Sequence, residues 1–226
     1  EVVIEERLTG PEVSLLAFTD GTTVRVMPPA QDHKRLLDDD QGPNTGGMGV
    51  IAPTPTCPPE LAEELTRTVL QPAVDGLRAE GRPFCGVLYA GLMLTANGPR
   101  VLEFNARFGD PETQAILPLL ETDLLEIASA CTGGTLNKLH PRWKHGAAAC
   151  VILASAGYPG KTNLGYTIHG LKSSTHTDSF IFHAGTRTGA KGEILTSGGR
   201  VLGVTAWADN HNEALQQAYS LVNTIS

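Results

Sequence analysis

Cysteine, aromatic residues and long hydrophobic runs are all scarce in this 226-residue chain. Its four cysteines, Cys57, Cys85, Cys131 and Cys150, form no C-x-x-C pair, which disfavours a disulfide framework or a zinc site. We interpret them as buried free thiols in a reducing compartment and expect a cytoplasmic location. No hydrophobic run approaches the roughly 18 residues needed to span a bilayer, and the first residues show no signal-peptide pattern.

Positive charge is also in the minority. Lys and Arg number 17 against 24 Asp and Glu, a net charge of −7, which argues against a general nucleic-acid binder or a protein of anionic membranes. This charge is still compatible with an anionic small ligand whose site gathers its own cations and a metal. The chain lacks a starting Met and opens on strand-like residues, so we expect it to be a fragment.

Hydrophobic residues make up 41% of the chain, enough for a core, and 25 Gly and 15 Pro cluster in what we expect to be ordered loops. Alternation and turn signals predict a chain of both strands and helices. We expect strands over 2–8, 12–20, 24–26, 86–94, 100–104 and 147–154, helices over 60–80, 123–131 and 210–222, and an aperiodic loop from 28 to 59. The chain changes to short strands with Gly and Thr turns in its last third, and we place a domain boundary near 143–146. This predicts two domains, 1–145 and a smaller β-rich domain over 146–226.

The segment 101–112 carries the strongest chemical signal. Side chains alternate along a strand, so Glu103 and Asn105 are expected on one face and Leu102 and Phe104 on a buried one. A carboxylate and an amide oxygen on one face suit a hard divalent cation held with nucleotide phosphates. Arg107 has the same parity and could contact a carboxylate or phosphate. A solvated strand end is the alternative.

Three other segments carry weaker signals. Residues 42–49 (GPNTGGMG) are rich in glycine and are either an anion-binding nest or a flexible loop, but not a Walker A motif. Residues 28–35 (PPAQDHKR) are either a solvated surface or part of a site. The residues from Glu5 to Leu8, with Glu12, could offer backbone groups to an adenine edge and a carboxylate to a ribose, or form an ordinary hairpin edge.

Taken together, these segments identify a family. The chain contains, in order, E-E-x-L-x-G-x-E, P-P-A-Q-D-H-K-R, P-N-T-G-G-M-G, Y-A-G-L-M-L and L-E-F-N-x-R-F-G-D-P-E-T-Q. This order closely resembles the glycinamide ribonucleotide synthetases, which are ATP-grasp enzymes, over nearly the whole chain. The resemblance implies an α+β fold, with an ATP-grasp lobe over 1–145 followed by the family's small β-rich C-terminal domain over 146–226.

The resemblance also implies an activity and its cofactors. Members of this family join glycine to 5-phosphoribosylamine through glycyl phosphate and release ADP and phosphate, in purine biosynthesis. ATP is the co-substrate and Mg²⁺ or Mn²⁺ the cofactor. The partners implied are these small molecules, with no nucleic acid and no membrane.

Matching positions imply roles for individual residues. Metal ligands are Glu103 and Asn105. ATP-binding residues are Glu5, Glu6, Arg7, Leu8, Glu12, Arg35 and Asn44. Asp32 and Arg107 are the implied catalytic residues, and Gly46, Gly47, Met48 and Arg107 hold the substrates.

Two departures qualify the resemblance. Residues 89–94 lack the further acidic metal ligand of many ATP-grasp enzymes, which agrees with the synthetase branch. The family's N-terminal domain and phosphate-covering lobe would precede residue 1, so the 226 residues alone are expected to be inactive. Another ATP-grasp ligase, or a non-catalytic domain of a larger multifunctional polypeptide, is the alternative, and fusion to other purine-pathway enzymes stays open.

Overall fold

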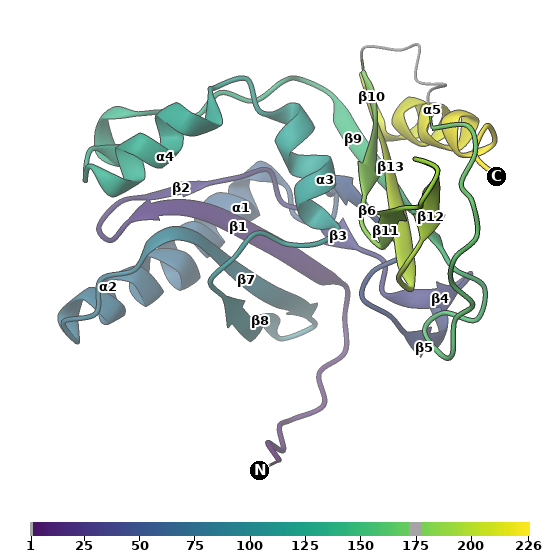
Figure 1. The fold of residues 1–226 in the computed structure, drawn as a ribbon. Coiled ribbons are helices and arrows are strands. Elements are labelled where there is room, and N and C mark those ends of the chain that lie inside the picture. Colours follow the sequence, from purple (N-terminus) through teal and green to yellow (C-terminus); the bar gives the residue numbers. More distant parts are fainter. Residues whose placement is uncertain (1, 172–177) are drawn as a thin grey trace. The chain divides into compact units, whose positions relative to one another are not determined.

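A computed structural model describes residues 2–171 and 178–226 of the chain (Figure 1). These residues form two compact units that alternate along the sequence. The first unit contains the residues up to Gln31, residues 54–108 and residues 122–141. The second contains residues 32–53, 109–121 and those from 142 onward. Both units combine antiparallel strands with helices, which confirms the predicted α+β class.

The first unit is built on a four-stranded antiparallel sheet in the order β2-β1-β7-β8. Its strands are β1 (Glu12–Asp20), β2 (Val24–Val26), β7 (Cys85–Thr95) and β8 (Gly98–Asn105). Alternate apolar side chains of β1, β2 and β7 form one core with the helical segment that follows residue 58. The sequence predicts all four strands because each alternates or is continuously apolar between turn residues.

The helical segment consists of α1 (Pro59–Leu65), a π-helical turn (Thr66–Leu70) and α2 (Gln71–Ala79). The predicted helix over 60–80 is therefore confirmed, with one irregularity. Leu65 and Leu70 are both fully buried, but five residues of regular α-helix would turn them to different faces. The wider π turn keeps both leucines on the sheet.

Helix α4 (Leu124–Thr132) completes the first unit and packs on β1 and β7. Asp123 caps it by accepting a hydrogen bond from the backbone N–H of Leu125 at 2.7 Å, as the predicted helix start requires. A short 3-10 turn over Leu136–Lys138 follows. Arg25 of β2 fixes this turn by donating to the backbone carbonyls of Leu136, Asn137 and Leu139.

The second unit contains a five-stranded sheet in the order β10-β13-β9-β6-β3. Its strands are β3 (Gln31–Asp32), β6 (Gly49–Ala52), β9 (Ala147–Ala154), β10 (Ser179–His183) and β13 (Arg200–Ala208). Helix α5 (His211–Val222) packs on β9 and β13, where Ala149, Ala208 and Ala214 form a small core. Small side chains on both sides let the helix approach the sheet closely.

Two hairpins and a short helix complete this unit. The hairpins are β4–β5 (Arg35–Leu37 and Gln41–Asn44) and β11–β12 (Thr186–Thr188 and Ile194–Thr196). Helix α3 (Glu112–Ile116) continues into a 3-10 turn over Leu117–Leu119 and packs on β6, β9 and β13. The sequence does not predict α3, because prolines bracket a helix only five residues long.

Three sequence predictions about the fold are wrong. Residues 2–8 form no strand and are mostly exposed, because β1 is already paired on both sides by β2 and β7. The segment 28–59 is not a structureless loop, since it contains β3, β4, β5 and β6. Phe104 is 46% exposed, because β8 is an edge strand and gives no residue to the core beneath the helices.

The cysteines are free, as predicted, and three of the four are buried. Burial raises the pKa of Cys57 and Cys131 to about 11 and that of Cys150 to about 12. Cys85 is exposed, against the prediction, because it stands at the first position of β7. In the part of the chain that the structure describes, no helix combines the length and hydrophobicity of a membrane span.

Candidate functional site

Glu103 and Asn105 lie on one face of β8, as the alternation predicts. Asn105 Nδ2 donates a hydrogen bond to Glu103 Oε1 at 2.9 Å. A bulge at Leu102 precedes them, since Glu103 pairs with Gly91 of β7 whereas Val101 pairs with Leu92. The bulge lies outside the Glu103–Asn105 pair and leaves its parity intact.

The pairing of three strands places further polar groups on the same face. Gly91 pairs with Glu103 on one side and with Ser14 of β1 on the other. Directly paired residues share a face of an antiparallel sheet, so Ser14 lies on the face of Glu103. Glu12, two positions before Ser14 in β1, lies on the same face. The predicted metal ligands and the predicted ribose carboxylate therefore share one sheet face.

Gly91 leaves a gap in the side-chain layer of this face. A Cβ at Gly91 would lie 3.4 Å from Glu103 Cγ and 3.9 Å from the ring of Tyr89. Tyr89 pairs with Asn105, and its hydroxyl forms a buried hydrogen bond with that of Ser14 at 2.8 Å. Because Gly91 has no side chain, the sheet surface is recessed between the polar side chains of Glu103 and Tyr89.

The donor set of β8 fits a hard divalent cation. Glu103 is exposed and Asn105 half-buried, and Glu103 Oε2 and Asn105 Oδ1 make no hydrogen bond within the described chain. Carboxylate and amide oxygens suit Mg²⁺, which usually takes one or two carboxylates and completes its shell with phosphate and water. Among the described residues, no group of three or more His, Cys, Asp or Glu side chains is placed to hold a metal ion.

The other predicted site residues of the first unit lie outside its helices and strands. The segment from Glu5 to Leu8 belongs to no helix or strand and is largely exposed. Arg107 follows β8, is exposed, and donates from Nη1 to the backbone carbonyl of Phe108 at 2.9 Å. The ring of Phe108 packs edge-on against Phe18 of β1, with ring centroids 6.4 Å apart, which ties this end of the segment to the sheet.

In the second unit, the structure brings Asp32 and Gly47 together. Gly47 has a φ of +107°, and a Cβ there would lie 2.5 Å from Asp32 Oδ1 and 2.6 Å from Pro111 Cδ. Met48 donates its backbone N–H to the carbonyl of His33 at 2.8 Å. The glycine-rich loop thus packs against Asp32 and His33. Only glycine fits at position 47.

Arg35 and Asn44 pair across the β4–β5 hairpin. Arg35 Nη1 donates to the carbonyl of Gly42 at 2.8 Å. Arg35 therefore closes its own hairpin, and both residues lie in the second unit, whereas the other predicted ATP-binding residues lie in the first.

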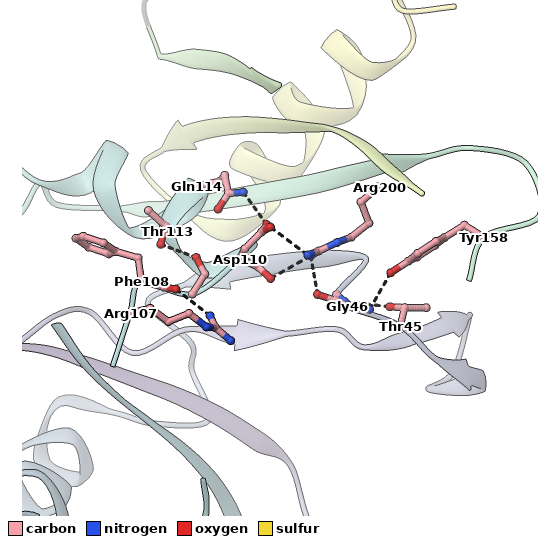
Figure 2. Close-up of polar contacts among 11 residues, drawn as sticks. Thr45, Gly46, Arg107, Phe108, Asp110, Thr113, Gln114, Tyr158 and Arg200 are labelled. Atoms are coloured by element: carbon pink, nitrogen blue, oxygen red, sulfur yellow. Dashed lines mark hydrogen bonds and ion pairs between the residues drawn. The ribbon is translucent and has the colours of Figure 1, made fainter. Parts of the chain in front are cut away.

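Sequence reasoning missed a polar cluster on the glycine-rich loop (Figure 2). Arg200, the first residue of β13, donates from Nη1 to the carbonyl of Gly46 at 2.6 Å and forms an ion pair with Asp110 at 3.0 Å. The hydroxyl of Tyr158 accepts the backbone N–H of Gly46 at 2.9 Å. Arg200 lies 154 residues from Gly46 in sequence, and its only local signal is the Gly-Gly-Arg run that opens a strand.

Comparison with known proteins defines the class first. Residues 1–113 match an ATP-grasp domain, which assigns the chain to the ATP-grasp class. Its fold is similar to that of a biotin carboxylase domain of the Hydrogenobacter thermophilus 2-oxoglutarate carboxylase, with a TM-score of 0.71 over 96% of this chain and 45% of that one, at 16% identity. It matches the phosphoribosylamine–glycine ligase of Thermotoga maritima more closely, with a TM-score of 0.82 and 35% identity over 98% of this chain and 54% of that one.

Sequence comparison then gives the family. Residues 1–113 match the phosphoribosylglycinamide synthetase ATP-grasp (A) domain, and residues 148–226 match the C domain of the same synthetase. The chain belongs to the phosphoribosylglycinamide synthetase family, which confirms the resemblance found in the sequence.

Curated relatives agree with this assignment. The phosphoribosylamine–glycine ligase of a Nostoc species is 52% identical over 99% of this chain and 53% of its own length. The trifunctional purine biosynthetic protein adenosine-3 of Gallus gallus is also 52% identical, over 100% of this chain and 22% of its own length. The chain thus spans about half the length of the single-function relative.

Proposed function

We propose that the protein containing this chain is an ATP-dependent ligase that joins glycine to 5-phosphoribosylamine, forming glycinamide ribonucleotide, ADP and phosphate. The observation that carries the proposal is the Glu103–Asn105 pair, held at 2.9 Å on the sheet face that also presents Glu12. Its position in a chain of the phosphoribosylglycinamide synthetase family supports the choice of substrates.

The proposed reaction has two steps. A carboxylate oxygen of glycine attacks the γ-phosphorus of ATP, the bond to the bridging oxygen breaks, and ADP leaves with glycyl phosphate formed. The amine nitrogen of phosphoribosylamine then attacks the glycyl carbonyl carbon, the amine loses a proton, and phosphate leaves. Positioning and charge stabilisation supply most of the catalysis in phosphoryl transfer.

Glu103 and Asn105 are the proposed ligands of Mg²⁺ or Mn²⁺. When bound, the metal neutralises phosphate charge during transfer of the γ-phosphoryl group. The hydrogen bond between the two side chains holds the carboxylate and the amide oriented before the nucleotide arrives. The structure of a distant fold relative was solved with MgADP, which is in keeping with this assignment.

The proposed nucleotide residues divide between backbone and side-chain roles. The segment from Glu5 to Leu8, which lies outside the helices and strands, is proposed to offer backbone groups to an adenine edge, and Glu12 a carboxylate to ribose hydroxyls. Arg35 and Asn44 are proposed near the nucleotide as well. The polar face around Gly91 supports the placement of Glu12, because Glu12, Ser14 and Glu103 share that face.

The proposed substrate residues are Asp32, Gly46, Gly47, Met48 and Arg107. Asp32 and Arg107 are the candidates for direct action on the amine and on the glycine carboxylate or phosphate. The contact between Asp32 and Gly47 supports this grouping, because it sets an acidic side chain against a backbone segment without side chains. Such a segment lets a phosphoribosyl group approach the main chain closely, because no side chain stands in the way.

Organisation and location are proposed on the same basis. We propose an ATP-grasp domain over 1–145 and a C-terminal domain over 146–226, and four free thiols favour the cytoplasm. Relatives of this chain include both single-function ligases and a trifunctional protein, so fusion to other purine-pathway enzymes is one arrangement open to it.

An ADP-release assay tests the function. The full-length product of the gene that encodes these residues is supplied with ATP, Mg²⁺ and either glycine with fresh phosphoribosylamine, bicarbonate or formate. We expect ADP release with glycine and phosphoribosylamine alone. Release with bicarbonate or formate instead would assign another ATP-grasp ligase, and no release with any substrate would favour a non-catalytic domain. The 226-residue polypeptide, assayed beside it, is expected to be inactive.

A further inference from the structure

Arg200 makes three hydrogen bonds that join separate segments of the second unit (Figure 2). Its Nη1 donates to the backbone carbonyls of Gly46 at 2.6 Å and of Asp110 at 3.0 Å, and its Nη2 donates to Asp110 Oδ2 at 3.0 Å. The side chain of Arg200 is only 21% exposed. The side chain of Asp110 is 52% exposed, and its bond with Arg200 joins two charged groups, which makes it stronger than a hydrogen bond between neutral groups.

The guanidinium also covers Gly46 by direct contact. A Cβ at Gly46 would lie 3.1–3.2 Å from Cζ, Nε and Nη2 of Arg200. The N–H of Gly46 donates to the hydroxyl of Tyr158 at 2.9 Å. Both polar groups of this one residue are therefore held by side chains from the C-terminal part of the chain.

These contacts fix the orientation of the peptide between Gly46 and Gly47. Its carbonyl accepts from Arg200 Nη1, and its N–H, on the opposite edge of the peptide plane, donates to Thr45 Oγ1 at 3.0 Å. Rotation of this peptide would break both bonds together. Glycines on both sides offer little steric resistance to such a rotation, so the bonds are what select one orientation.

The groups that hold the loop are themselves fixed. Asp110 Oδ1 accepts from Gln114 Nε2 at 2.8 Å, which leaves Oδ2 to Arg200. A Cβ at Gly199 would overlap the Tyr158 ring, so the ring lies against the residue preceding Arg200. Ser155 donates its N–H to the carbonyl of Gly199 and its hydroxyl to that of Gly198, both at 2.8 Å. The clamp, as we name the set of Arg200, Tyr158 and Asp110, is thus pre-organised.

We propose that Arg200 and Tyr158 are positioning residues that hold the two peptides on either side of Gly46, Tyr158 through the N–H of Gly46 and Arg200 through its carbonyl, in the loop conformation that receives phosphoribosylamine. The proposal rests on the proposed function for the identity of the substrate. The physical claim, that the clamp sets the conformation of the loop, is independent of the proposed function. Neither residue takes part in the chemistry.

Hydrogen–deuterium exchange tests the clamp without any activity. In Arg200→Gln and in Tyr158→Phe, the amides of Gly46 and Gly47 should exchange roughly tenfold faster than in the unaltered protein, as expected for lost hydrogen bonds in a locally opening segment. Amides of β1, in the other unit, should be unchanged. Arg187→Gln, an exposed arginine of β11, is the matched control and should leave loop exchange unaltered. Unchanged exchange in both clamp variants overturns the proposal.

Kinetics of the full-length protein test the consequence. Arg200→Gln should raise the KM for phosphoribosylamine about 10- to 100-fold, the range expected for misplaced binding groups, with the KM for ATP within about twofold. Arg200→Lys keeps the charge but not the planar guanidinium, so its KM for phosphoribosylamine should lie between those of the unaltered protein and Arg200→Gln. A purely structural role would lower the melting temperature and the active fraction but leave both KM values unchanged, and that result also overturns the proposal.

The two tests separate the clamp from the proposed function. If the unaltered protein does not use phosphoribosylamine, the proposed function fails, and exchange at Gly46 and Gly47 still decides the clamp. If Arg200→Gln does not fold, Arg200→Lys and Tyr158→Phe carry the same two measurements.

Discussion

Asn105 donates a hydrogen bond to Glu103 from two positions further along β8, and their donor and acceptor atoms are 2.9 Å apart. The contact aligns two oxygen-bearing groups on one sheet face at an exposed edge strand. An amide that orients a carboxylate in this way leaves one oxygen of each side chain for a cation. The first prediction concerns the charge of that carboxylate.

Glu103→Gln should lower turnover at least about 100-fold in the full-length protein, because the loss of one group that stabilises transferred charge commonly costs about 2.7–4 kcal/mol. The fold should survive, since Glu103 is exposed. Turnover is measured across Mg²⁺ concentrations up to saturation. Glu64→Gln, an exposed glutamate of α1, is the control and should behave as the unaltered protein. Near-normal turnover at saturating Mg²⁺ would exclude Glu103 as a metal ligand.

Gly47→Ala should impair catalysis more than it impairs stability. Alanine at a φ of +107° is strained, and its Cβ would meet Asp32 and Pro111, so the free energy of unfolding should fall by about 1–3 kcal/mol. Displacement of Asp32 should cost turnover about 100-fold. Both quantities are measured, by urea unfolding and by ADP release.

Gly192→Ala separates strain from contact. Gly192 has a φ of +81°, but nothing lies within 4 Å of a Cβ there. It should lose about 1 kcal/mol from backbone strain and keep full turnover. If Gly47→Ala behaves like Gly192→Ala in both measurements, the glycine-rich loop is only a connector.

Ser14 and Tyr89 should show energetic coupling across β1 and β7. Their hydroxyl groups form a buried hydrogen bond at 2.8 Å. Ser14→Ala and Tyr89→Phe should each cost about 1–2 kcal/mol, and the double variant less than their sum, because each single change leaves one buried hydroxyl without this bond. Urea unfolding of all four proteins gives the coupling, expected near 1 kcal/mol. Additive effects would show that the two hydroxyl groups act independently.

Buried thiols should make the protein less stable in alkali. Burial raises the pKa of Cys150 from 9.0 to about 12. Below pH 9, the thiol is protonated in both states, so its contribution is fully present. As pH rises from 9 toward 12, the unfolded chain loses the proton first, which favours unfolding. The free energy of unfolding should fall over this range, and less steeply in Cys150→Ala. Equal slopes would contradict the raised pKa.

Sequence patterns predicted those elements whose signals are local. The strand over residues 147–154 and the strand over 12–20 have the predicted bounds, since continuous apolar runs between turn residues leave few alternatives. Residues 2–8 carry a similar pattern but do not pair with the strand that follows them in sequence, because β1 already has β2 and β7 as partners. Whether a β-prone segment pairs depends on neighbours that its own sequence does not reveal.

In the candidate site, too, local features were predicted and long-range contacts were not. The shared face of Glu103 and Asn105 follows from the period of a strand, and the bulge at Leu102 stops short of disturbing it. Arg200 could not be predicted, because its partner Gly46 is 154 residues away and a single arginine beside glycines is common. Contacts of this kind are set by the tertiary fold alone.

The contact between Arg200 and Gly46 limits how this chain can be recombined with a relative. Gly46 and Asp110 lie in the segment that matches one family domain, 1–113, whereas Tyr158 and Arg200 lie in the segment that matches the other, 148–226. A chimera with its crossover between these segments keeps the loop in place only when both parents carry the matching residues. The conformation of this loop therefore depends on four residues, two from each family domain, which must be kept together in any chimera.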